Sequence, residues 1–222
     1  MSIASNIQRI KSTLPPGVTL VAISKFHPAE MIREAYAGGQ RVFGESKAQE
    51  LAAKYEELPK DIEWHFIGHL QTNKIKYIAS FIHTIQSIDS LKLLQEVDKQ
   101  AARFNRNIDV LLQIHIAEEE TKFGLSMQEC EELLQSEVFA SLEHITVCGI
   151  MGMATNTDNE QQIRKEFHTL YTFFTELKKK YFPDNRVFTQ LSMGMSQDYR
   201  IAIEEGSTMV RIGSLIFGER TY

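Results

Sequence analysis

Several features are scarce in this sequence of 222 residues, and each scarcity excludes a class of protein. It has two cysteines, Cys130 and Cys148, and their small number and wide separation exclude a disulfide-dense scaffold. We expect both thiols to be reduced and buried. No stretch is rich in proline, glycine and serine together, so neither a flexible linker nor a low-complexity tract is predicted.

Positive charge and long apolar runs are also scarce. The formal net charge of -5 argues against nucleic acid as a partner, because nucleic-acid binding usually requires a basic face. No window approaches 18 uncharged apolar residues, so no transmembrane helix and no membrane partner are expected. Residues 1–17 carry charges where a secretory signal needs an apolar run. The sequence therefore predicts a cytoplasmic location.

What the sequence does contain is a regular alternation of strand-like and helix-like segments. The strand-like segments are residues 18–24, 41–45, 63–68, 82–87, 108–115, 144–153, 187–194 and 207–218. They are apolar at nearly every position, which is typical of parallel strands buried on both faces. Eight such strands alternating with helices predict an α/β fold, a single (β/α)8 TIM barrel.

The helical segments have recognisable ends. Ser126 is predicted to cap a helix over 126–136, with Glu129 completing a capping box. An extra N-terminal helix is expected over 3–14, and a short helical segment over 71–81. We interpret residues 1–222 as one domain. An open, doubly wound sheet is the alternative, because periodicity does not reveal closure.

In a TIM barrel the functional residues lie at the C-terminal ends of the strands. Lys25 follows the first strand, where a lysine is not needed merely to end it. Toward the C-terminal ends of strands 7 and 8 lie two clusters of small and polar residues that suit a phosphate group, because glycines allow close approach of backbone N–H donors. These clusters contain Ser192, Met193 and Gly194, and Arg211, Gly213 and Ser214.

The two features together indicate a ligand that carries both an aldehyde and a phosphate. We expect Lys25, at an apolar rim near the cationic Arg211, to have a depressed pKa and to form a Schiff base with a carbonyl. Pyridoxal 5'-phosphate (PLP) fits this description. Arg211 would face the pyridine nitrogen and keep it unprotonated, which moderates carbanion chemistry.

Simpler interpretations are open for each residue. Lys25 is alternatively a solvated rim lysine or an ion-pair partner of Glu45, and Arg211 a buried partner of Glu219. His65 and His69 share a strand parity, but without a third ligand candidate no metal site is predicted. The charged stretch 118–124 is either a lid or a solvated loop.

Longer motifs carry a resemblance that covers essentially the whole chain. They are VAISK with a proline three residues on, AGGQRVFGES, WHFIGHLQTNK, TKFGL, GIMGMAT and LSMGMSQDYRIAIEEGSTMVRIGSLIFGER. With these motifs the chain resembles the YggS/PROSC family of PLP homeostasis proteins. The resemblance implies a barrel similar to the N-terminal domain of bacterial alanine racemase.

The resemblance also implies roles for individual residues. Lys25 would hold PLP as a Schiff base, and Arg211 would lie beside the ring nitrogen. The phosphate cup would comprise Ser192, Met193, Gly213 and Ser214. Two departures from the family pattern are Ser46, where an asparagine is usual, and Phe26-His27, where Thr-Lys or similar is common.

The family's function, vitamin B6 homeostasis, is then expected here, as opposed to catalysis. A racemase needs an acid/base group on each face of the cofactor, and the second one is commonly a tyrosine from another domain. The sequence ends at Tyr222, soon after the last strand, so no such domain is expected. We predict a monomeric PLP carrier without turnover that supplies PLP-dependent apo-enzymes. The alternatives are a small PLP enzyme such as an amino-acid racemase and, less favoured, a Schiff-base aldolase.

Overall fold

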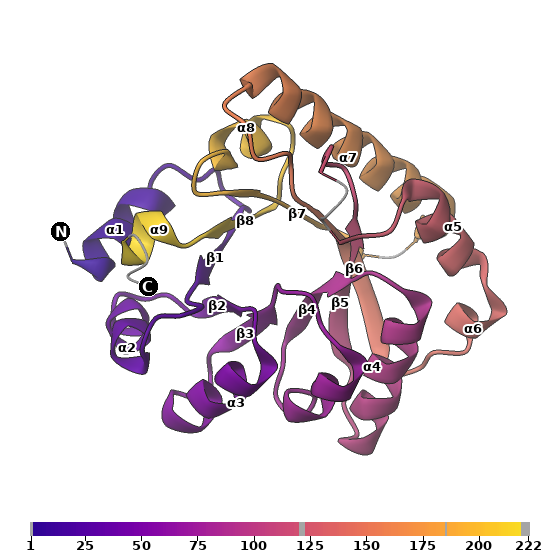
Figure 1. Cartoon of the computed structure of the whole chain (residues 1–222), viewed down its shortest axis with the longest axis horizontal. Coiled ribbons are helices and arrows are strands. Elements are labelled where there is room, and N and C mark those ends of the chain that lie inside the picture. The colour runs from indigo at the N-terminus through magenta and orange to yellow at the C-terminus, as the bar shows by residue number, and fades with distance from the viewer. Residues whose placement is uncertain (1, 120–122, 185, 219–222) are drawn as a thin grey trace.

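Eight parallel strands form a closed barrel in the computed structural model, which describes residues 2–119, 123–184 and 186–218. The strands follow one another around the barrel in chain order, and β8 pairs with β1 (Figure 1). The strands are β1 Thr19–Ile23, β2 Val42–Glu45, β3 Glu63–Phe66, β4 Thr84–Ile88, β5 Ile108–Ile114, β6 Ile145–Gly152, β7 Gln190–Met195 and β8 Met209–Ile212. The closure confirms the predicted TIM barrel and excludes the open sheet.

Helices surround this barrel, as Figure 1 shows. They are α1 Ile3–Lys11, α2 Ala29–Ala37, α3 Ala48–Glu57, the 3-10 helix η1 Thr72–Tyr77, α4 Leu91–Arg103, α5 Met127–Gln135, α6 Glu137–Ala140, α7 Glu160–Tyr181, α8 Tyr199–Glu204 and α9 Ser214–Phe217. The extra N-terminal helix is therefore confirmed as α1. It lies beside α9, where Asn6 Nδ2 donates a 3.0 Å hydrogen bond to the carbonyl of Ile216.

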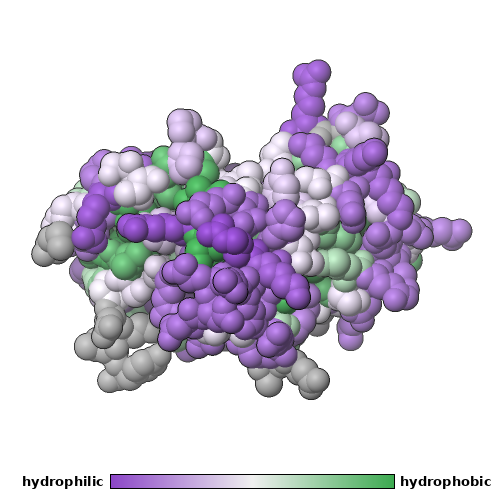
Figure 2. Space-filling model, turned by 90° about the horizontal axis from the view of Figure 1, so that it is seen from above, coloured by the Kyte–Doolittle hydropathy of each residue, from purple (hydrophilic) through white to green (hydrophobic). Residues whose placement is uncertain are grey.

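The helices are held by apolar stripes that face the barrel. In α7 the buried residues include Ile163, Phe167, Leu170 and Phe174, a spacing of three and four that places them on one face. Burying each such side chain contributes roughly 1.5–3 kcal/mol relative to exposure. The outer face over this part of the molecule is predominantly hydrophilic in Figure 2. None of the helices that the structure describes is both long and apolar enough to cross a membrane.

The structure differs from the prediction in three places. The eighth strand was expected to continue to residue 218, but it ends at Ile212. At Gly213 the chain turns into α9, where the N–H groups of Ile216 and Phe217 donate to the Gly213 carbonyl. The short helical segment expected over 71–81 is the 3-10 helix η1, which covers only Thr72–Tyr77. The helix α6 was not predicted because its single turn is too short to show a periodicity.

Both cysteines are free and buried, as the sequence predicted. Burial raises the pKa of the Cys130 thiol to about 12 and that of Cys148 to about 12. Since the thiolate is the reactive form, both side chains behave as small apolar groups.

The predicted capping box of α5 is present. Ser126 Oγ accepts a 3.1 Å hydrogen bond from the N–H of Glu129, and Glu129 Oε2 accepts one of 2.8 Å from the N–H of Ser126. Replacing Ser126 with alanine is expected to lower the free energy of unfolding by about 1 kcal/mol, whereas glycine costs only a few tenths. Urea unfolding of both variants tests this, and an equal loss in the two would contradict the cap.

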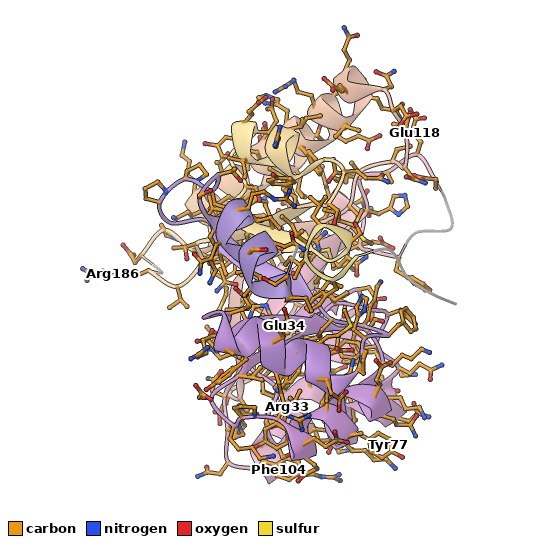
Figure 3. The ribbon with its side chains drawn as sticks, turned by 90° about the vertical axis from the view of Figure 1, so that its left-hand side faces the viewer. Arg33, Glu34, Tyr77, Phe104, Glu118 and Arg186 are labelled. Atoms are coloured by element: carbon orange, nitrogen blue, oxygen red, sulfur yellow. The ribbon has the colours of Figure 1, made fainter. Side chains whose placement is uncertain are left out.

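The two ends of the barrel lie on opposite sides of the molecule. Glu118, which follows β5, and Arg186, which precedes β7, are labelled on opposite sides in Figure 3. The C-terminal ends of the strands thus face one side, and their N-terminal ends face the other.

Candidate functional site

A cavity of about 810 Å³ lies at the C-terminal end of the barrel. Four of the six predicted site residues line it: Lys25, Arg211, Gly213 and Ser214. The apolar part of its lining includes Ile23 and Ile67, and the polar part includes hydroxyl groups from three loops. The barrel therefore brings the predicted amine and the predicted guanidinium to one space.

Lys25 enters this cavity from a tight turn after β1. The N–H of His27 donates to the carbonyl of Ser24 at 3.1 Å, and Phe26 adopts a left-handed φ of 68°. That strained conformation is held because the N–H of Phe26 donates to Glu50 Oε1 at 3.0 Å. The His27 ring stacks on Phe217 with 4.9 Å between ring centroids. Lys25 itself is half-buried.

A buried ion pair lies directly behind this turn. Lys54 Nζ is 2.8 Å from Glu45 Oε1, and it also donates to the carbonyl of Ser24 at 3.0 Å. Ser24 Oγ donates to the same Glu45 oxygen at 2.6 Å. Burial raises the pKa of Glu45, against the opposing effect of Lys54. The ion pair of Glu45 is therefore formed with Lys54, and the alternative pairing with Lys25 is wrong.

Arg211 on β8 is buried and oriented by two hydrogen bonds. One guanidinium nitrogen donates to Ser192 Oγ at 2.7 Å and the other to the carbonyl of Gly152 at 3.0 Å. Burial lowers the pKa of Arg211 to about 10, with Asp198 acting in the opposite direction, so the group stays cationic at neutral pH. The alternative partner Glu219 lies outside the described residues.

The other two predicted site residues lie behind the cavity wall. Ser192 is fully buried, and its hydroxyl donates to Gln86 Oε1 at 2.7 Å while accepting from Arg211. Met193 packs its side chain into the core, and its carbonyl accepts from Ser207 Oγ at 2.8 Å. Neither is among the described residues that line the cavity. Ser192 acts on the site by holding Arg211.

Polar groups that the prediction did not include take part in the lining. Ser196 and Gln197 line the cavity beside Gly213, whose N–H donates to Ser196 Oγ at 3.3 Å. A side chain at Gly213 would come within 3.2 Å of the Ile23 carbonyl, so glycine suits this close approach. Ser196 lies in the loop between β7 and α8, which begins at Tyr199.

The loop after β6 supplies the opposite part of the lining. Thr155, Asn156 and Thr157 face the cavity. Thr155 is fixed by the buried Glu166, which accepts from its N–H at 2.6 Å and from its hydroxyl at 2.7 Å. The motif GIMGMAT contains Thr155 and was the available sequence signal.

The histidines considered as a metal pair have separate partners. His69 Nδ1 lies 3.0 Å from Asp89 Oδ2, and its ring stacks on Phe123 at 3.9 Å. His65 lies inside the barrel with its Nδ1 2.7 Å from Gln86 Nε2. The interpretation of His69 as a hydrogen-bonded rim histidine is confirmed. Of the predicted lid 118–124, residues 120–122 lie outside the described residues.

Chemically, the cavity suits a flat ligand with an electrophilic carbon and an anionic group. It offers a primary amine, a buried permanent cation, apolar side chains, and hydroxyl and backbone N–H donors in one space. These are the groups that PLP requires, so the residues present fit that cofactor. The departure residue Ser46 is not among the described lining residues.

Comparisons with known proteins agree with this geometry. The model of the alanine racemase N-terminal domain matches residues 1–221. The pyridoxal phosphate homeostasis protein of Aquifex aeolicus is 43% identical over 204 residues, which cover 91% of this chain and 87% of the relative. The pyridoxal phosphate homeostasis protein of Pasteurella multocida is 38% identical over 208 residues, which cover 92% of this chain and 88% of the relative.

Solved structures show the same barrel. PipY of Synechococcus elongatus, determined with PLP bound, matches with a TM-score of 0.86 and 36% identity over 98% of this chain and 100% of PipY. An alanine racemase of Clostridium difficile matches with a TM-score of 0.75 at 16% identity, which shows the fold alone; 57% of the racemase is covered. This chain therefore belongs to the pyridoxal phosphate homeostasis family, whose barrel is that of the alanine racemase N-terminal domain.

Proposed function

We propose that this protein binds PLP in the cavity at the C-terminal end of the barrel and holds it through a Schiff base on Lys25. The observation that carries the proposal is the presence of Lys25 and the buried Arg211 in the lining of one cavity. The PLP-bound structure of PipY, at 36% identity, supports the same ligand. The lysine amine would condense with the aldehyde and release one water.

The other lining residues have complementary roles in this proposal. Arg211 would donate a hydrogen bond to the pyridine nitrogen and so keep it unprotonated, which weakens the ring as an electron sink. Ser196, Gly213 and Ser214 would contact the phosphate with hydroxyl and N–H donors. Ser192 and Met193, predicted as direct contacts, would support this wall from behind. The chain from 1 to 222 would act as one binding unit.

The role we propose is homeostasis of PLP without turnover. The relatives are named homeostasis proteins, which favours a carrier over an enzyme. The described residues that line the cavity include no tyrosine, the residue type expected to act opposite Lys25 in a racemase. Delivery to PLP-dependent apo-enzymes, a monomeric state and a cytoplasmic location stay predictions.

The test uses the purified wild-type protein. Added PLP should produce a visible absorption band, and borohydride reduction should fix the mass of the cofactor on the peptide that contains Lys25. When the PLP-loaded protein is incubated with L-alanine, the enantiomeric purity of the alanine should stay unchanged. Absence of the band at excess PLP would refute binding, and rapid racemisation would refute the carrier role.

A further inference from the structure

A second cluster of chemically active side chains lies at the opposite end of the barrel. Glu63, His65 and His83 each offer one donor atom, and these atoms all lie within 4.8 Å of one another. Glu63 and His65 belong to the beginning of β3, and His83 directly precedes β4. The cluster is therefore at the N-terminal ends of the strands, away from the cavity that contains Lys25.

The strand register explains why these three side chains meet. Because successive side chains of a strand alternate, Glu63 and His65 point to the same face of β3. β3 pairs with β4 in parallel, with His65 opposite Thr84, so His83 lies next to that pair. The rings of His65 and His83 are nearly parallel, with 7° between their planes and 5.8 Å between their centroids.

Hydrogen bonds determine which ring nitrogens face the cluster. His83 Nδ1 lies 2.8 Å from Thr84 Oγ1, and His65 Nδ1 lies 2.7 Å from the side-chain amide of Gln86. In both rings Nδ1 is thus hydrogen-bonded, so Nε2 is the nitrogen with which each histidine would coordinate a metal ion. Histidines that bind metals typically donate their other ring N–H to an oxygen acceptor. His83 Nδ1 already faces such an oxygen, whereas His65 Nδ1 accepts from the Gln86 amide nitrogen, so this amide must turn when the metal binds.

We propose that Glu63, His65 and His83 form a binding site for a divalent first-row transition metal, with zinc as the preferred ion. Two imidazoles and one carboxylate match zinc, whereas magnesium and calcium favour oxygen ligands throughout. Three protein ligands leave a fourth position for water.

The present spacing requires a modest closure around the ion. Ligand atoms about 2.0–2.1 Å from a tetrahedral metal lie about 3.3 Å from one another. Glu63 and His83 are exposed and can rotate toward the buried His65, so the barrel itself need not move. When Nε2 of His65 holds the metal, its Nδ1 carries the proton, and Gln86 turns its amide oxygen toward that N–H. Its amide nitrogen then faces Ser192 Oγ, which accepts from both Gln86 and Arg211.

The experiment uses full-length protein that has been treated with a chelator and then dialysed. Zinc is titrated in competition with a chromophoric chelator, and cobalt is added separately to record its d–d absorption. We expect one zinc per chain and a cobalt band. His83→Ala and Glu63→Gln should each weaken zinc binding by at least about tenfold. Both residues are exposed, so both variants should fold, which circular dichroism verifies.

A matched control is His168→Ala, because His168 is an exposed histidine on α7 that pairs with Glu205. This variant should bind zinc as tightly as the wild-type protein. The proposal is overturned if the wild-type protein fails to compete with the chelator. It is also overturned if His83→Ala and Glu63→Gln bind zinc like the wild type, which would place the ion elsewhere. Neither result would bear on the separate proposal that Lys25 binds PLP.

Discussion

Replacing Lys25 with alanine is expected to abolish the borohydride-stable attachment of PLP to the protein. The reason is chemical, since the variant has no primary amine at the point where the β1 turn enters the cavity. The visible band of the Schiff base should disappear together with the added mass. The dissociation constant for PLP should rise by at least about tenfold, which corresponds to about 1.4 kcal/mol.

Residual binding of PLP by this variant is also expected. Arg211, Gly213 and Ser214 line the same cavity and are unchanged in it, so a noncovalent complex should form at higher PLP concentration. Equilibrium dialysis against PLP measures this directly. A variant that lost all affinity would show that the hydroxyl and guanidinium groups contribute less than we propose.

A second lysine provides the control for this experiment. Lys47 is exposed, precedes α3, and lies over the Phe26 ring with 4.8 Å from Nζ to the centroid. It is therefore near the same turn but is not among the described residues that line the cavity. Lys47→Ala should retain the band and the reduced adduct on Lys25. If Lys25→Ala kept the adduct and Lys47→Ala lost it, the assignment of the amine would be wrong.

The fold was predictable from the sequence because the apolar pattern of each strand indicates which of its faces are buried. Segments that are apolar at nearly every position are typical of strands buried on both faces, and eight of them in alternation with helices are compatible with few architectures. Only the short elements escaped. One turn of helix, as in α6 or α9, gives no periodicity, and the end of β8 depends on how Gly213 turns the chain.

The sequence predicted which residues line the site where the strand pattern alone places them in the barrel. It did not do so where tertiary contacts determine their position. Lys25 and Arg211 both line the cavity at the C-terminal end of the barrel, the end to which the strand pattern assigned them. Their contacts with PLP stay predictions. Ser192 was expected to line the cavity, but it lies behind Arg211, a difference that depends on how deeply β7 is buried. Ser196 was missed because the path of the loop before α8 is set by tertiary hydrogen bonds.

The ion pair of Lys54 and Glu45 is another contact that the sequence alone does not predict. Glu50 and Lys54 are spaced as an i,i+4 helix pair that can be read from the sequence. That the ammonium also reaches the buried Glu45 and the carbonyl of Ser24 depends on how α3 packs against β1 and β2. This three-way contact was not predicted, yet it has a large expected effect.

Replacing Lys54 with methionine is expected to lower the free energy of unfolding by about 3–5 kcal/mol near neutral pH. Methionine fills a similar volume, but it leaves the carboxylate of Glu45, which is fully buried, without its cation. It also removes the hydrogen bond to the Ser24 carbonyl. Urea unfolding followed by circular dichroism measures the loss. Lys60→Met, which removes an exposed pair with Glu56, should change little.

The stability lost in Lys54→Met should depend on pH, and the burial of Glu45 determines whether the loss grows or shrinks as the pH rises. Burial already raises the pKa of Glu45 above its ordinary value of 4.5, and removing Lys54 removes the main opposing effect. An acid with a raised folded-state pKa contributes stability below its unfolded pKa and loses that contribution as the pH rises through the folded value. Lys54→Met should therefore lose more stability at pH 8 than at pH 5.

A double variant separates this electrostatic cause from lost packing. Adding Glu45→Gln to Lys54→Met removes the buried charge, so most of the lost stability should return and the extra pH dependence should vanish. If the double variant is as unstable as Lys54→Met, and equally so at pH 5 and pH 8, the ammonium acts mainly through the Ser24 carbonyl. The turn that presents Lys25 to the cavity would then depend on a single hydrogen bond from α3, and PLP binding should weaken in both variants alike.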